Sequence, residues 1–252
     1  MLRIAAALAA LLPGFAAMAE PLDAVEAAGV LHVGTPGDYR PYAFRGDDGS
    51  FAGADIEMVR EFAAGLGVRA EIEQTSWKSM SEDFTGGRFD MVVGGVSVTP
   101  ERAREGDFSI ALSEDGKRPV VRCADKGLYT SLAAIDRPDV RVVVNLGGTN
   151  EAFARARFAL APLTVAADNL SIPERLLGGQ EDVFVTDGVE VDLLARRFAG
   201  RLCAAAVDQP FTHLTKAWWL AKDPAFKRAA DLFLAAAKKD GRWQAALDRN
   251  MH

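Results

Sequence analysis

Two carboxylates stand three positions apart in the segment TDGVE at 186–190, directly after the apolar run 183–185. A carboxyl group at such a place can serve as a general acid if burial keeps it protonated. The same spacing fits a capping box, with Asp187 as the N-cap and Glu190 as the N3 residue of a helix. The spacing alone leaves both interpretations open.

The segment SVTPER at 97–102 is a candidate binding site for a carboxylate. Thr99 is a typical N-cap residue, and Pro100 suits the first position of a helix. Arg102 then lies in the first turn, where the helix dipole disfavours a cation by about 0.3–1 kcal/mol. An arginine at this unfavourable position is a candidate to bind a carboxylate through two parallel hydrogen bonds from its guanidinium group. The free N–H groups of the helix start would assist this binding. A solvated surface arginine explains the pattern equally well.

Two further features carry weaker signals. The glycine-rich segment NLGGTN at 145–150 could bring backbone N–H groups close to an anion, although an ordinary strand–helix loop is the more common explanation. Trp77 and Tyr42 are either cleft aromatics or core residues, and core residues are more common.

Most familiar catalytic signatures are absent from the sequence. The histidines, at positions 32, 213 and 252, show no metal-ligand spacing. The segment 95–99 has Thr99 where a nucleophile elbow needs glycine, and Gly147-Gly148 lacks the lysine of a phosphate-binding loop. We therefore expect no metal, no nucleotide and no other cofactor.

The first residues predict export. Arg3 precedes an apolar stretch from 4 to about 15, and Ala17-Met18-Ala19 has the small-x-small pattern of a cleavage site. We expect a signal peptide at 1–19, cleaved after Ala19, and a periplasmic protein. The apolar stretch is shorter than the roughly 20 residues that span a bilayer.

Charge and cysteine content agree with an exported protein that binds a small molecule. The net charge is −6 and there is no basic run, which argues against nucleic acid or an anionic membrane as partner. Cys123 and Cys203 are the two cysteines, and an oxidising compartment favours a disulfide between them over free buried thiols.

The order of elements predicts an α/β fold with mostly parallel sheets flanked by helices. The expected strands are at 30–33, 68–74 and 91–93, and then again at 119–123, 141–144, 183–185, 202–207 and 217–220; the expected helices are at 56–66, 79–84, 151–158, 189–197 and 224–237. The second series of strands, which begins at 119, predicts a second lobe and a ligand cleft between the two lobes. Lobe 1 is expected to comprise 20–116 with 211–252, and lobe 2 to comprise 117–210.

These segments together resemble the type II periplasmic solute-binding proteins of the polar amino acid class, family 3. Within that superfamily the chain is most similar to the cyclohexadienyl dehydratases, exported enzymes that act on prephenate and arogenate. The likeness covers nearly the whole chain after residue 19. It is carried by the motifs GDYRPYAF, TSWKSM, GRFDMVVGGVSVTPER, DGKRPVVRC, NLGGTNEAFAR and TDGVE.

The resemblance implies roles for individual residues. Ser97, Thr99 and Arg102 match the segment that holds the carboxylate of the ligand, and Asp187 matches the aspartate that commonly receives its amino group. The similarity to the enzymes lies in Asn145, Lys117 and above all Glu190, which matches their general acid. We expect the remaining ligand contacts from Thr149, Trp77 and Tyr42. Of these, the aromatic residues Trp77 and Tyr42 would line the ring of the substrate.

The implied activity is a cofactor-independent dehydration with decarboxylation, from prephenate to phenylpyruvate and from arogenate to phenylalanine. It requires the pKa of Glu190 to be raised towards neutrality. The alternative is a receptor of the same fold that carries an amino acid to a membrane permease without turnover. No stable membrane association is expected, and a homo-oligomer is compatible with the sequence.

Overall fold

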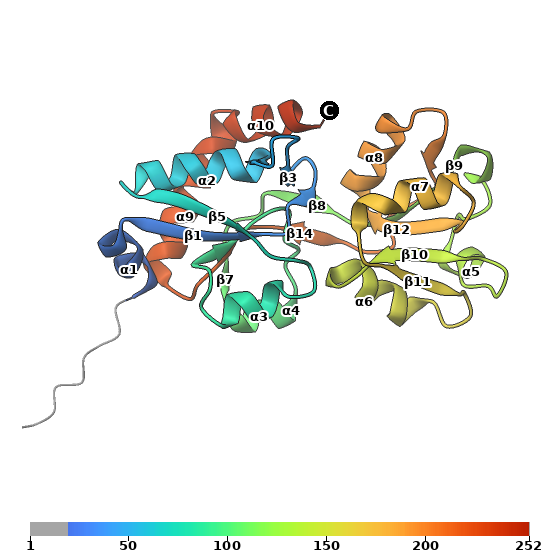
Figure 1. Cartoon of the computed structure of the whole chain (residues 1–252), viewed down its shortest axis with the longest axis horizontal. Helices are drawn as coiled ribbons and strands as arrows, with labels where there is room; N and C mark the ends of the chain where they lie inside the picture. The colour runs from blue at the N-terminus through green and yellow to red at the C-terminus, as the bar shows by residue number, and fades with distance from the viewer. Residues whose placement is uncertain (1–19, 252) are drawn as a thin grey trace, which may run out of the picture.

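The computed structural model describes residues 20–251, so the predicted signal peptide at 1–19 and its cleavage after Ala19 lie outside the described residues. The chain forms two lobes side by side, each built on a five-stranded sheet (Figure 1). Two α/β lobes are what the sequence predicts. No helix within 20–251 is long and apolar enough to cross a membrane.

Lobe 1 is built on the sheet with strand order β5-β1-β6-β15-β7. Helix α2 shows why these segments fold together, because its residues Ile56, Val59 and Phe62 recur at helical spacing and are all buried. The strands are β1 (Val30–Thr35), β5 (Arg69–Gln74), β6 (Met91–Val92), β7 (Asp107–Phe108) and β15 (Trp219–Leu220), and the helices are α1 (Pro21–Ala28), α2 (Ala54–Gly65), α3 (Met80–Thr85), α4 (Pro100–Glu105), α9 (Pro224–Lys239) and α10 (Arg242–Asn250).

Lobe 2 is built on the sheet with strand order β11-β10-β12-β9-β13. Its strands are β9 (Lys117–Arg122), β10 (Val142–Asn145), β11 (Leu163–Ala166), β12 (Val183–Asp187) and β13 (Leu202–Ala204). Its helices are α5 (Leu132–Ile135), α6 (Gly148–Arg157), α7 (Ile172–Leu177) and α8 (Gly188–Arg197), with short 3-10 turns η1 (Cys123–Asp125) and η2 (Asn169–Ser171).

The core of lobe 2 lies on both faces of its sheet. Val142 and Val144 belong to one buried apolar cluster, whereas Val143 between them belongs to another. Successive side chains of a strand point to opposite faces, so these clusters cover the two faces of the sheet. This explains why the central strands read as continuous apolar runs.

Two antiparallel strands connect the lobes, β8 (Ser113–Asp115) and β14 (Leu214–Lys216). β9 and β15 follow them along the chain, and each is antiparallel to a central strand of its sheet. The predicted strands therefore occur in the expected order, but β9 and β15 run in the opposite direction to their neighbours. Each of these two strands follows directly after the chain has crossed from the other lobe. The boundaries of the lobes at 116–117 and 210–211 stay a prediction.

A small sheet of lobe 1 faces lobe 2. It consists of β2 (Asp38–Tyr39), β3 (Ala43–Arg45) and β4 (Phe51–Ala52). In Figure 1, β3 lies on the same side of the molecule as helix α8 of lobe 2.

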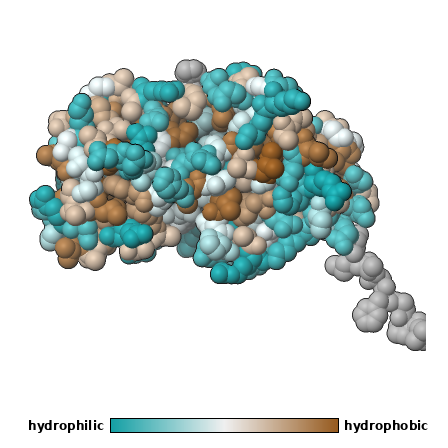
Figure 2. All heavy atoms as spheres, turned by 180° about the vertical axis from the view of Figure 1, so that it is seen from behind, coloured by the Kyte–Doolittle hydropathy of each residue, from teal (hydrophilic) through white to brown (hydrophobic). Residues whose placement is uncertain are grey.

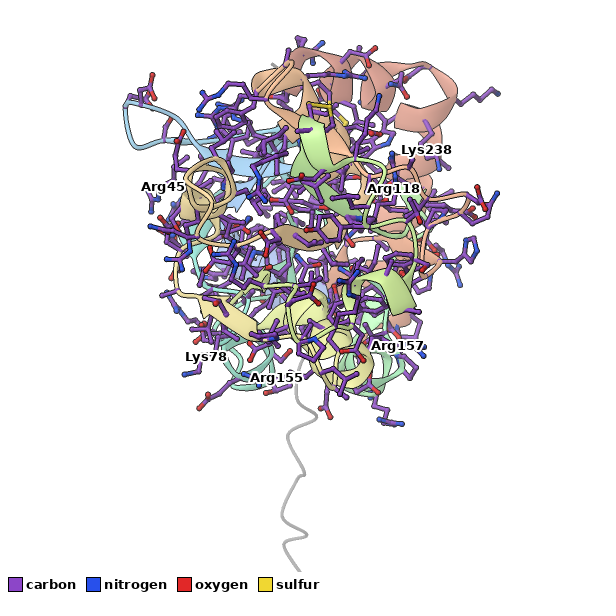
Figure 3. The ribbon with its side chains drawn as sticks, turned by 90° about the vertical axis from the view of Figure 1, so that its right-hand side faces the viewer. Arg45, Lys78, Arg118, Arg155, Arg157 and Lys238 are labelled. Atoms are coloured by element: carbon purple, nitrogen blue, oxygen red, sulfur yellow. A yellow bond between two sulfur atoms is a disulfide. The ribbon has the colours of Figure 1, made fainter. Side chains whose placement is uncertain are left out.

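The predicted disulfide is confirmed between Cys123 and Cys203, whose Cα atoms are 4.8 Å apart. The two residues are brought together because β9 and β13 are neighbouring strands. Figure 3 shows the bond in yellow near the upper edge of lobe 2.

Candidate functional site

Two neighbouring strands of lobe 2 deliver polar side chains to one edge of the sheet. Asn145 is the last residue of β10 and Asp187 is the last residue of β12, and these two strands are parallel. The carboxyl ends of parallel strands are where ligands bind in open α/β sheets. This edge of lobe 2 faces lobe 1, because Tyr39 of β2 donates a hydrogen bond from its hydroxyl to Asp187 Oδ2 at 3.0 Å.

Asp187 is the centre of a buried ionic cluster. Lys117 Nζ lies 2.6 Å from Asp187 Oδ1, and Lys216 Nζ forms an ion pair with Asp187 Oδ2. All three side chains are buried. Burial acts to raise the pKa of Asp187, but the two ammonium groups hold this pKa well below its usual range. The carboxylate is therefore ionised and fully engaged.

Lys117 also joins the glycine-rich segment to this cluster. Its ammonium group donates to Thr149 Oγ1 at 2.9 Å and to Asn150 Oδ1. Asn150 in turn donates to Asn145 Oδ1 at 2.7 Å. The predicted residues Lys117, Asn145, Thr149 and Asp187 thus belong to one hydrogen-bonded network.

The close approach of the lobes at this segment depends on Gly147. Its φ of +77° favours glycine. A Cβ atom there would lie 2.6 Å from the backbone nitrogen of Lys78 in lobe 1. A larger residue would therefore push the lobes apart.

Glu190 is a buried carboxyl group with raised proton affinity. Its Oε1 accepts a hydrogen bond from Asn169 Nδ2 at 3.0 Å, and its Oε2 accepts one from the hydroxyl of Thr186. Burial raises the pKa of Glu190 to about 7, although the hydrogen bonds from Thr186 and Asn169 act to lower it. The group can therefore hold a proton near neutral pH.

The capping-box interpretation of Asp187 and Glu190 is wrong. Asp187 occupies the N-cap position of α8 but makes no capping hydrogen bond with its side chain. Asp115 of β8 takes that role, because its carboxylate accepts from the backbone N–H of Gly188 at 2.8 Å and from that of Val189 at 3.3 Å. Because Asp115 caps the helix from a distant strand, the side chains of Asp187 and Glu190 are not needed as caps and face the interlobe space.

Arg102 is buried, with 7% of its surface exposed, so the interpretation as a surface arginine is wrong. Thr99 caps α4 as expected, since its Oγ1 accepts from Arg102 N at 3.3 Å. One arginine nitrogen donates to the Ser97 carbonyl at 2.9 Å. Burial lowers the pKa of Arg102 to about 10, at which the guanidinium is still charged at neutral pH. Ser97 Oγ accepts from Lys216 at 2.9 Å, which connects this segment to Asp187.

The two predicted aromatic residues lie in different places. Trp77 packs edge-on against Tyr39, with ring centroids 5.8 Å apart, and its Nε1 donates to Asp38 Oδ1 at 2.9 Å. Tyr42 instead belongs to the buried core of lobe 1, and its hydroxyl is 2.8 Å from Ser113 Oγ. The placement of Tyr42 favours the core alternative that the sequence left open.

Some of these groups line a small cavity of about 20 Å³, which has room for roughly one water molecule, whereas Arg102, Lys117 and Asp187 do not line it. The lobes are therefore closed upon each other, and a ring-sized ligand requires them to open. The cavity is lined by Tyr39, Trp77, Asn145, Gly148, Thr149, Asn150, Asn169 and Glu190.

Sequence reasoning missed several residues of this site. Lys216 is the most important of them, and its one sequence signal is a lone lysine beside the apolar run 217–220. Tyr39, Asn150 and Thr186 stand inside motifs that were recognised, although no role was assigned to them, whereas nothing in the sequence marks Asn169 as a neighbour of Glu190.

Hydrophilic and hydrophobic residues are interspersed on the outer surface. Figure 2 shows hydrophilic residues spread over the rear face of both lobes, with an indentation of the outline between them. In the end-on view of Figure 3 the labelled basic side chains are spread over the molecule, although two of them share helix α6: Arg45, Lys78, Arg118, Arg155, Arg157 and Lys238.

Residues 31–252 match the family of bacterial extracellular solute-binding proteins, family 3. Cyclohexadienyl dehydratase from Pseudomonas aeruginosa is 40% identical over 220 residues, which are 87% of this chain and 82% of that protein. The L-cystine-binding protein TcyJ from Escherichia coli is 28% identical over 229 residues, which are 90% of this chain and 85% of that protein.

Solved structures give the same picture. The ancestral amino acid-binding protein AncCDT-1, a precursor of cyclohexadienyl dehydratase, superposes with a TM-score of 0.82 at 28% identity, covering 93% of this chain and 100% of that one. An ancestral cyclohexadienyl dehydratase is 39% identical with a TM-score of 0.57, covering 93% of this chain and 98% of that one.

Proposed function

The chain belongs to the bacterial extracellular solute-binding proteins of family 3, and within that family we propose that it is an enzyme, a cyclohexadienyl dehydratase acting on prephenate and arogenate. The observation that carries this proposal is the buried carboxyl group of Glu190, with its pKa raised to about 7, on the wall of the interlobe cavity. The 40% identity to a cyclohexadienyl dehydratase supports it.

In the proposed reaction the closed lobes hold the substrate by its carboxylates, with Arg102 and Lys117 as the cations. Protonated Glu190 donates its proton to the ring hydroxyl, which leaves as water. The ring carboxylate departs as carbon dioxide, and the electron pair of that broken C–C bond completes the aromatic ring. A positioned acid of this kind contributes about 10²–10⁴-fold to the rate.

The same environment that raises the pKa favours the reaction. A closed cavity excludes water and leaves fixed dipoles around the reacting atoms. Asn145, Asn150 and Thr149 are held by hydrogen bonds to each other or to Lys117, so they are preorganised before the substrate binds.

The ionic cluster argues against the alternative of an amino-acid receptor. In the receptors that the chain resembles, the aspartate that matches Asp187 commonly receives the amino group of the ligand. Here Asp187 is already bound by Lys117, Lys216 and the hydroxyl of Tyr39. An incoming ammonium group would have to displace one of these donors.

The proposal includes the setting of the enzyme. It acts in the periplasm after removal of residues 1–19, and its lobes, 20–116 with 211–252 and 117–210, open to admit substrate and close over it.

The experiment is to incubate the purified protein with prephenate and to follow phenylpyruvate, beside Glu190→Gln and the control Glu82→Gln. Glu82 is exposed on α3. We expect turnover by the native protein and the control, and a loss of about 10²-fold or more in Glu190→Gln. Tight binding of arginine or lysine without turnover of prephenate or arogenate would contradict the proposal and favour the receptor.

A further inference from the structure

Glu190 borders two separate spaces in the closed molecule. One is the interlobe cavity of about 20 Å³. The other is a hollow of about 350 Å³, which shares Asn169 and Glu190 with the cavity and which we call the rear hollow. Both lobes contribute to it: Asp38, Arg40 and Phe44 from the small sheet of lobe 1, and Asn169, Leu193 and Arg197 from lobe 2. Phe44 belongs to β3, and Leu193 and Arg197 belong to α8, both of which are labelled in Figure 1.

The proposed reaction makes the second space relevant. Each turnover converts a substrate with two carboxylates into one carboxylate, carbon dioxide and water, and so consumes one proton. That proton comes from Glu190, which is left ionised after the step. The enzyme therefore cannot react again until one proton from solvent has returned to the carboxylate.

The interlobe cavity is a poor route for this proton while the lobes are closed. Without ligand it has room for about one water molecule, and in the complex the product occupies the space between the lobes after the reaction. The rear hollow has room for on the order of ten water molecules. It thus offers a hydrated path to Glu190 that does not pass through the substrate.

Asn169 stands between the two spaces and lines both of them. Its side chain is 7% exposed, and Nδ2 donates to Glu190 Oε1. Its Oδ1 is buried and accepts no hydrogen bond from the described part of the protein. A buried amide oxygen without a donor is costly, so this atom calls for a donor such as water.

The charges around the path are mixed. Asp187, Tyr39 and Lys117 lie near Glu190 on the cleft side. Further charged groups line the rear hollow from both lobes, namely Asp38, Arg40, Arg45, Asp47, Glu174 and Arg197.

We propose that the rear hollow is the route by which solvent returns a proton to Glu190 in each turnover, with Asn169 positioning the water next to the carboxylate. The inference rests on the proposed dehydratase function. The proton passes from solvent through water in the hollow to a Glu190 oxygen, and no other bond changes.

The test is to fill the hollow without touching the cleft. Leu193→Trp places an indole inside it, and Leu170→Trp places one at its rim, where Leu170 is 63% exposed and tolerates a larger side chain. Leu232→Trp is the matched control, since Leu232 is 68% exposed on α9 of lobe 1. Melting temperatures show whether each variant folds. If Leu193→Trp does not fold, the kinetics of Leu170→Trp decide the test.

The steps up to loss of carbon dioxide precede reprotonation, so filling the hollow should lower kcat and leave kcat/KM for prephenate nearly unchanged. We expect kcat to fall by about tenfold or more, after a burst of about one phenylpyruvate per enzyme from the proton already on Glu190. The solvent deuterium isotope effect on kcat should rise in these variants but not in Leu232→Trp.

An unchanged kcat in folded variants, or a joint fall of kcat and kcat/KM without a burst, would overturn the route. Failure of the proposed function looks different, because the native protein itself would then form no phenylpyruvate.

Discussion

The ammonium group of Lys216 binds the carboxylate of Asp187, and the side chains are 2% and 7% exposed. Lys216 ends a connecting strand beside lobe 1, where it forms a β-bridge with Ser97, whereas Asp187 ends a central strand of lobe 2. The ion pair therefore joins the two lobes. It holds the lobes closed and occupies the carboxylate that an amino-acid ligand would need.

Replacing Asp187 by asparagine should destabilise the protein strongly. The change leaves Lys117 and Lys216 buried without a counter-charge, and breaking a buried pair in this way costs about 3–5 kcal/mol. The measurement is the free energy of unfolding in urea. Asp192→Asn on α8 is the control, because its partner Arg118 is 26% exposed and such a pair is worth less than about 1 kcal/mol. Equal stability of Asp187→Asn and the native protein would show that the ammonium groups need no carboxylate there.

The activity should fall as the pH rises through about 7. Glu190 must be protonated to donate, and burial raises its pKa to about 7, so the fraction of active enzyme drops tenfold per unit above this value. The measurement is kcat/KM for prephenate between pH 5 and 9, at constant ionic strength. A profile that stays flat to pH 9 would rule out Glu190 as the acid.

Glu190→Gln should also change how stability depends on pH. Below pH 4.5 the carboxyl group is protonated in both the folded and the unfolded chain and contributes no difference. Between 4.5 and about 7 the unfolded chain ionises while the folded one does not, so the native protein loses roughly 3 kcal/mol, at about 1.4 kcal/mol per unit. The variant lacks this loss, so it should gain stability relative to the native protein as the pH rises from 4 to 8. The measurement is the free energy of unfolding in urea. If its difference between Glu190→Gln and the native protein stays constant over that pH range, Glu190 titrates normally.

Under the proposed function, the protein should prefer prephenate to arogenate. Arg102, Lys117 and Lys216 supply three buried cations against the one carboxylate of Asp187, which suits a substrate with two carboxylates and no ammonium group. We expect kcat/KM for prephenate to be higher by about tenfold or more, equivalent to about 1.4 kcal/mol. Lys216→Gln removes one ammonium group from Asp187 Oδ2, which keeps the hydrogen bond from Tyr39, and should narrow the ratio of kcat/KM values. Equal values in the native protein would contradict this account of the charges.

Removing the disulfide should lower stability without altering the site. Cys123 and Cys203 are 80 positions apart, and the chain-entropy model assigns such a loop about 4 kcal/mol. The double variant Cys123→Ala/Cys203→Ala should therefore unfold at a lower urea concentration while its KM for prephenate is retained. A changed KM would show that the bond also shapes the cleft.

Several features of this protein follow from the sequence alone. The periodicity of apolar residues indicated every strand of the two five-stranded sheets except β7 and β11, and the helices α2, α3, α6, α8 and α9, because burial on one face repeats at a fixed spacing in each kind of element. It did not indicate the short strands outside these sheets or the helices α1, α5, α7 and α10. The motifs that contain Thr99, Arg102 and Glu190 indicated which side chains could bind an anion or donate a proton. The pair Cys123 and Cys203 was predictable from the oxidising compartment of an exported chain.

The tertiary structure decided what those side chains can do. The sequence TDGVE fits a capping box as well as an acid site. The structure excludes the capping box, because Asp115 caps α8 from 73 positions away. Lys216 was not recognised because its partner Asp187 becomes its neighbour only when the connecting strands bring the lobes together. The proton affinity of a carboxyl group depends on desolvation and on nearby charges in space. Periodicity along the chain carries no information about either, so the acid role of Glu190 could be proposed from the sequence but its pKa could not.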